Sequence, residues 1–102
     1  MANTLVFSNG DHAEHRPVVV VRAPLRPLDY LVFLQRTSTC FHLAGVDHDR
    51  DPALGLDRRG KWVFEYQRSV RADIFESHRF EYRGVLEPDY LAGLLSEWEA
   101  QP

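Results

Sequence analysis

Five histidines in a chain of 102 residues make a metal site the first chemistry to consider. His12 and His15 are three residues apart, a spacing that on a helix places two imidazoles on one face, as zinc sites require. Asn9 and Gly10 precede them and favour a hairpin turn. In the extended arm of a hairpin, residues three apart point to opposite faces. We therefore predict no metal at this pair.

Three aspartates alternate further along the chain, at Asp47, Asp49 and Asp51. Calcium loops begin with oxygen ligands at positions 1, 3 and 5, because hard cations prefer oxygen. The later positions do not fit, since Pro52 stands where a glycine makes the sharp turn and Arg58 where a glutamate closes the site. The pattern favours a solvated charged loop over a cation site.

Nucleophilic catalysis finds little support in the remaining polar residues. Cys40 and His42 would share one face of a strand but lie about 7 Å apart at ~3.3 Å per residue, beyond hydrogen-bond reach. Ser77 and His78 are neighbours, and neighbours in an extended chain point apart. The scattered glycines form no phosphate-binding loop. We predict no catalytic residue, no cofactor and no metal ligand.

The charge of the chain limits its partners. The formal net charge is −3 and the calculated pI is about 5.9, whereas nucleic-acid binding depends on an excess of basic residues. The longest apolar runs are Val18–Val21 and Tyr30–Leu34, far short of the ~20 residues of a membrane helix. Residues 1–11 lack signal-peptide features, and the single cysteine excludes an internal disulfide. We expect a cytoplasmic protein that binds neither nucleic acid nor membrane.

The N-terminal half reads mainly as strands. We predict a first strand near residues 4–8 that turns back into residues 11–15. Val18–Val21 has four β-branched residues without polar alternation, which is typical of a central strand covered on both faces. Residues 28–37 fit either a helix or a buried strand, and their spacing slightly favours the helix. Alternation over residues 37–43 predicts a further strand.

The C-terminal half starts with a predicted long loop over residues 45–60, which contain Pro52, Gly55 and several aspartates. Alternation predicts strands over residues 61–67 and 75–85. Apolar residues at helical spacing after Pro88 predict a C-terminal helix. Its apolar partners are expected to be the strand aromatics Trp62, Phe64, Tyr66, Phe80 and Tyr82. The other sheet face would carry Glu65, Gln67, Arg79, Glu81 and Arg83.

These elements predict one domain over residues 1–102, of the α+β class. The sheet is expected to be mostly antiparallel with four or five strands, covered on one face by the C-terminal helix and by a second helix if residues 28–37 are helical.

For function, the sequence favours a small non-enzymatic protein-binding domain of the inhibitor, immunity or adaptor type. Tyrosine, tryptophan and arginine dominate binding hot spots, and the chain is rich in them. Long loops in compact domains are often functional. The predicted partner-binding residues, directed at a partner with a basic site, are Asp47, Asp49, Arg50, Asp51, Asp57 and Arg58.

Two alternatives remain open. One is a small metal-assisted or acid–base enzyme whose site assembles on folding from distant residues, drawn from His12, His15, His42, His78 and the loop aspartates. The other is a homodimeric structural subunit that associates through a sheet edge or the charged sheet face.

Overall fold

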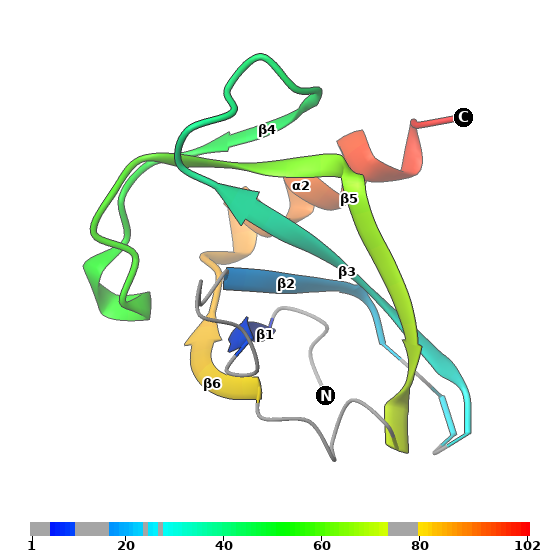
Figure 1. The fold of residues 1–102 in the computed structure, drawn as a ribbon. Helices are drawn as coiled ribbons and strands as arrows, with labels where there is room; N and C mark the ends of the chain where they lie inside the picture. The colour runs from blue at the N-terminus through cyan, green and yellow to red at the C-terminus, as the bar shows by residue number, and fades with distance from the viewer. Residues whose placement is uncertain (1–4, 10–16, 24, 27, 74–79) are drawn as a thin grey trace.

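The computed structural model describes residues 5–9, 17–23, 25–26, 28–73 and 80–102 (Figure 1). These residues form a six-stranded sheet of order β4-β5-β3-β2-β1-β6, in which every pairing is antiparallel. The elements are β1 (Leu5–Asn9), β2 (Pro17–Arg22), β3 (Tyr30–Thr37), β4 (Gly45–His48), the 3-10 turn η1 (Pro52–Leu54), β5 (Gly60–Arg71), β6 (Phe80–Val85) and α2 (Pro88–Glu99). The expected α+β class is confirmed, with six strands in place of four or five.

The valine run occupies the middle of the sheet, as expected. β2 lies between β1 and β3, and its four valines are at most 5% exposed. Val19 and Val21 belong to the apolar cluster that includes the helix, whereas Val18 and Val20 join Leu31 and other residues on the opposite face. A run without polar alternation is therefore explained by burial on both faces.

The first strand pairs with β2 and β6. Asn9 is the last residue of β1 and pairs with Phe80, so it lies within the sheet. The pairing of Ser8 with Pro17 makes β2 the antiparallel partner of β1. Gly10 and the arm expected over residues 11–15 lie outside the described residues.

The preference for a helix over residues 28–37 is wrong, because Tyr30–Thr37 form the strand β3. β3 pairs with β2 along one edge and with β5 along the other. Val32 and Leu34 belong to the apolar cluster that includes the helix, whereas Leu31 and Phe33 belong to the cluster on the opposite face. Leu31, Val32, Phe33 and Leu34 are at most 6% exposed. Helical spacing is accidental here, because a strand buried on both faces needs no alternation.

The strand expected over residues 37–43 is also wrong beyond its first residue. Thr37 ends β3, and its hydroxyl oxygen accepts hydrogen bonds from the backbone N–H groups of Thr39 (3.2 Å) and Cys40 (3.1 Å). Local side-chain bonds of this kind compete with a sheet ladder and turn the chain. The segment after Thr37 is therefore a turn that leads back to β4.

β5 confirms the strand expected over residues 61–67 and continues to Arg71. Its register against β3 changes midway: Phe33 pairs with Arg68, whereas Gln35 pairs with Val63. Two steps along β3 thus match five along β5, and the extra residues produce the sharp bend of β5 in Figure 1. Before the bend, Trp62 is fully buried and Phe64 packs on the same apolar cluster, as expected.

The C-terminal helix is confirmed as α2. Both carboxylate oxygens of Glu87 accept backbone N–H bonds, from Asp89 at 3.1 Å and Tyr90 at 2.9 Å, and thereby cap the first turn. Leu91 and Leu94 are buried against the sheet. β6 confirms the C-terminal part of the strand expected over residues 75–85, and residues 75–79 lie outside the described part. No described helix is long and apolar enough to cross a membrane.

The sheet curls, so that its two edges approach one another through η1. This turn lies between β4 and β5 but contacts β6, at the opposite end of the strand order. Leu54 of η1 is 6% exposed and lies against Gly84, which adopts a φ of 135°. A Cβ atom on Gly84 would come within 2.7 Å of Leu54 Cδ2. Glycine at this position therefore permits the contact that closes the curl.

Candidate interaction surface

A buried arginine organises the segment expected to be a long loop. Arg36 is 5% exposed, and its Nη2 donates to the carbonyl oxygens of His48 (3.2 Å), Asp49 (3.2 Å) and Arg58 (2.9 Å). These three carbonyls lie on the two sides of the segment, so one guanidinium holds both sides. Residues 45–60 accordingly contain β4, η1 and a bridge between Asp51 and Leu56, where the sequence predicted only a loop.

His48 completes the anchor from within β4. Its Nδ1 accepts a hydrogen bond from Arg36 Nε at 3.3 Å, which requires Nδ1 to be unprotonated and places the ring proton on Nε2. Nε2 lies 3.7 Å from Asp51 Oδ2. Burial first, and then the charge of Arg36, lower the pKa of His48 below its usual value. The imidazole is therefore neutral near pH 7.

Tyr90 ties the helix to the same segment. Its hydroxyl donates to the Asp47 carbonyl oxygen at 2.7 Å, and its ring lies 4.7 Å from that of His48. Burial raises the pKa of Tyr90, so that the phenol keeps the proton it donates. The centre of the His48 ring also lies 5.7 Å from that of Trp62. In this anchor group of Arg36, His48 and Tyr90, the arginine and the tyrosine donate to backbone carbonyls of the segment. Arg36 also donates to His48, whose Nε2 lies beside Asp51, so the group holds the segment in position.

The predicted partner-binding residues lie on the hairpin that β4 and β5 form, over residues 45–60. Asp51 is partly buried beside His48 and serves the anchor. The others have exposed side chains, at Asp47, Asp49, Arg50, Asp57 and Arg58. Residues 45–60 hold four aspartates and three arginines, a net charge of −1 from −4 and +3. The surface is therefore of mixed charge.

Sequence reasoning missed three residues that border the hairpin. Phe41 is 36% exposed in the turn after β3, and Arg59 Cζ lies 5.4 Å from the centre of its ring. Lys61 Nζ donates to the Phe41 carbonyl oxygen at 3.0 Å, and Arg59 Nη2 lies 3.7 Å from Asp47 Oδ2. The signal was obscured because an alternating strand would have turned Phe41 inward, whereas the Thr37 turn exposes it.

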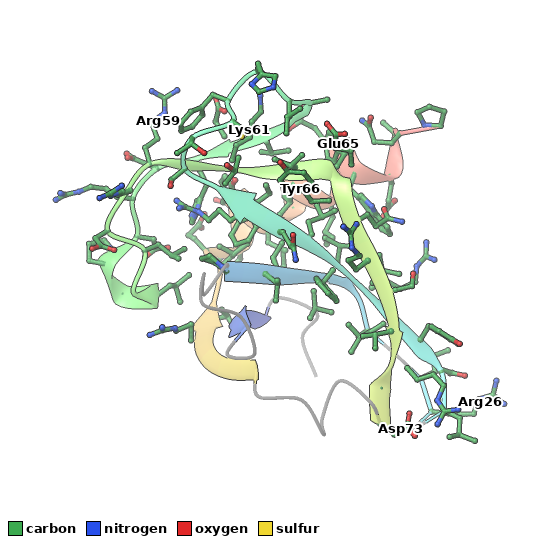
Figure 2. All side chains as sticks on the ribbon, viewed as in Figure 1. Arg26, Arg59, Lys61, Glu65, Tyr66 and Asp73 are labelled. Carbon is green, nitrogen blue, oxygen red and sulfur yellow. The ribbon has the colours of Figure 1, made fainter. Side chains whose placement is uncertain are left out.

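We call this region the hairpin surface, and Figure 2 shows Arg59 and Lys61 close together at its edge, where β5 begins. It combines an aromatic ring with cations and carboxylates held by a buried scaffold. Its members are Phe41, Asp47, Asp49, Arg50, Asp57, Arg58, Arg59 and Lys61.

The metal-assisted form of the enzymatic alternative gains no metal site within the described part of the chain. There, no group of three or more histidine, cysteine, aspartate or glutamate side chains could hold a metal ion. His42 is exposed, and Cys40 is partly buried in the turn that replaces the expected strand. His12, His15, Ser77 and His78 lie outside the described residues.

Comparison of the chain with protein-family models, with curated proteins and with solved structures finds no match.

Proposed function

We propose that the chain is a non-enzymatic protein-binding domain of the inhibitor, immunity or adaptor type, which binds its partner through the hairpin surface. The observation that supports this proposal is the Arg36 anchor, with its donor bonds to three carbonyls of the hairpin. A segment already held in one conformation loses less entropy on binding than a loose loop does. The buried anchor thus prepares exposed side chains for recognition.

The side chains of the surface define the chemistry of the partner. Asp47, Asp49 and Asp57 suit basic groups, and Arg58 and Arg59 suit carboxylates. The partly exposed ring of Phe41 offers an apolar contact beside an arginine, and aromatic residues and arginine are both enriched in protein interfaces. The partner is accordingly a folded cytoplasmic protein with a basic site next to an apolar spot. Charge complementarity of this kind contributes specificity and a fast association rate.

The proposal is tested by immobilising the domain and capturing partners from extract of its own source, at low and moderate salt, with identification by mass spectrometry. We expect one dominant partner at near-equal stoichiometry. The triple variant D47K/D49K/D57K should reduce its recovery by at least about tenfold, since reversed charges at an interface cost several kcal/mol. The melting temperature should stay close to that of the wild type, because the three side chains are exposed.

The matched control places the same charge change away from the hairpin. The variant E65K/E97K/E99K alters three exposed glutamates of β5 and α2. Its recovery of the partner should equal that of the wild type. Equal recovery with D47K/D49K/D57K, or equal loss with both triple variants, would show that the hairpin surface does not recognise the partner.

A further inference from the structure

A second surface lies at the end of the molecule away from the hairpin, in the connection between β2 and β3. Leu25 is 93% exposed, Leu28 67% and Tyr30 60%, which makes them the three most exposed large apolar side chains of the described residues. Figure 2 shows Arg26 of this connection far from Arg59 and Lys61. Contiguous exposed apolar side chains rimmed by charge mark interaction sites.

The same connection contains a hollow beside the projecting leucine. The hollow has a volume of about 530 Å³ and is lined by Arg22, Ala23, Leu25, Leu28, Asp29 and Tyr30. The surface therefore contains both an apolar side chain that projects and an apolar hollow that could receive such a side chain. Across a twofold axis, each copy would insert Leu25 into the hollow of the other.

The charges at the rim are self-complementary as well. Arg26 Nε lies 3.5 Å from Asp29 Oδ2, with the two side chains 83% and 32% exposed. A twofold interface brings the same patch of two copies together, so the patch must carry both signs of charge. In such an arrangement Arg26 of each copy faces Asp29 of the other. A surface of one sign would instead have indicated a partner of the opposite charge.

We propose that this surface, called the leucine face and formed by Leu25, Arg26, Leu28, Asp29 and Tyr30, binds a second copy of the chain in a twofold-symmetric dimer. A standard interface of ~800 Å² per partner would take about an eighth of the 6405 Å² surface of this chain, more than five residues provide. The dimer is therefore weak, and its population rises with protein concentration. It leaves both hairpin surfaces open, at opposite ends of the assembly, so that the dimer is bivalent.

The test is sedimentation equilibrium of the full chain from low micromolar to millimolar concentration. The wild type should rise from 11.8 kDa toward twice that mass. L25E should lower the association constant by at least about tenfold, because it places a charge in an apolar contact. R26E should lower it too, since a glutamate would face Asp29 of the other copy. Circular dichroism checks that both variants fold, as the exposure of Leu25 and Arg26 leads us to expect.

Two controls match these changes at other places. V85E exchanges an apolar side chain that is 51% exposed in β6, and R50E reverses an exposed arginine of the hairpin. Both should dimerise as the wild type does. A wild type that stays monomeric over the whole range overturns the inference, as does a dimer that survives L25E or is lost equally in V85E.

A vesicle experiment separates a second copy from a lipid surface. Vesicles of phosphatidylcholine with phosphatidylserine are sedimented with the wild type and with L25E at low protein concentration. No binding by either is the expected result. Binding by the wild type that L25E abolishes would assign the leucine face to anionic lipid and overturn the dimer. Neither experiment depends on the partner of the hairpin surface.

Discussion

Arg36 and Arg58 illustrate how the same residue type acquires different roles from its surroundings. Arg36 is buried under the hairpin and donates to three carbonyl oxygens. The side chain of Arg58 is exposed, and Arg58 takes part in the anchor only through its backbone carbonyl oxygen. The planar guanidinium suits this task because its donors diverge from a rigid fork. Burial lowers the pKa of Arg36. The guanidinium nevertheless remains charged, because the ordinary pKa of arginine is far above physiological pH.

Removal of the Arg36 guanidinium should therefore destabilise the fold. We expect R36M to lower the free energy of unfolding by about 2–4 kcal/mol, because it leaves buried carbonyls of the hairpin without donors. R58M, at an exposed position, should change it by less than about 0.5 kcal/mol. Urea denaturation followed by tryptophan fluorescence measures both. Equal stabilities of the two variants would contradict the role of Arg36 as an anchor.

His48 should make stability depend on pH in a defined direction. Burial and Arg36 lower its folded-state pKa below 6.5, the value expected in the unfolded chain. Above pH 6.5 both states hold the imidazole neutral, and its contribution is complete. As the pH falls further, the unfolded state takes up the proton first, and the free energy of unfolding decreases by up to about 1.4 kcal/mol per pH unit until the folded pKa is reached.

The variant H48N isolates this effect. The asparagine side-chain oxygen can accept the hydrogen bond from Arg36 that Nδ1 accepts in the wild type, and asparagine does not titrate. Urea denaturation from about pH 7.5 to about pH 5, above the range in which ordinary carboxylates titrate, should show a smaller loss of stability in H48N than in the wild type. H42N controls for the loss of a histidine at an exposed position outside the anchor. Parallel profiles of H48N and the wild type would show that His48 does not titrate differently on folding.

At the scale of the elements, local signals were reliable where one face of an element is solvated. The α2 helix has an apolar stripe and a capping glutamate, and both are visible in the sequence. β3 has neither, because its residues alternate between two apolar clusters, one on each face of the sheet. Its apolar run is equally compatible with a helix until its neighbours are known. The Thr37 turn was missed for a related reason, since its alternating pattern matched a strand while its hydroxyl bonds stopped one.

Two glycines of different elements should respond oppositely to substitution by alanine. Gly84 of β6 has a φ of 135° and faces Leu54, so G84A should cost about 1–3 kcal/mol. Gly93 lies in α2 with no atom within 4 Å of an added Cβ, and G93A should stabilise the helix by about 0.5–1 kcal/mol. Thermal and urea denaturation report both. Stabilisation by G84A would show that β6 and η1 are not held in the described contact.

At the scale of the whole molecule, the curl of the sheet gives the hairpin a structural role. η1 contacts β6, so the hairpin that carries the proposed binding surface also joins the two edges of the sheet. The Arg36 anchor and the contact of Leu54 with Gly84 hold this hairpin from two sides. The proposed binding surface and the closure of the fold thus share one segment, in which the buried residues are structural and the exposed ones form the proposed surface.

Truncation of Leu54 tests this closure. Leu54 is 6% exposed and belongs to the apolar cluster of the helix face, so L54A should lower the free energy of unfolding by about 2–4 kcal/mol. L28A removes the same atoms from a side chain that is 67% exposed, and at dilute concentration it should change stability by less than about 0.5 kcal/mol. Amide hydrogen exchange in β6 should accelerate in L54A. Unchanged exchange there would mean that η1 does not close the sheet.

The sequence by itself determined the α+β class, the central valine strand, the C-terminal helix and the position of most charged residues on the surface, because these follow from composition and from periodicities within one element. It predicted that residues 45–60 are a charged segment, but not that they contain the strand β4 and the turn η1. Only the tertiary structure decided that β3 is a strand, that Arg36 and His48 fix the hairpin, and that Phe41 joins its exposed surface. Those outcomes depend on contacts between residues far apart in the chain, such as Arg36 with Arg58 or Tyr90 with Asp47, and local spacing carries no information about them.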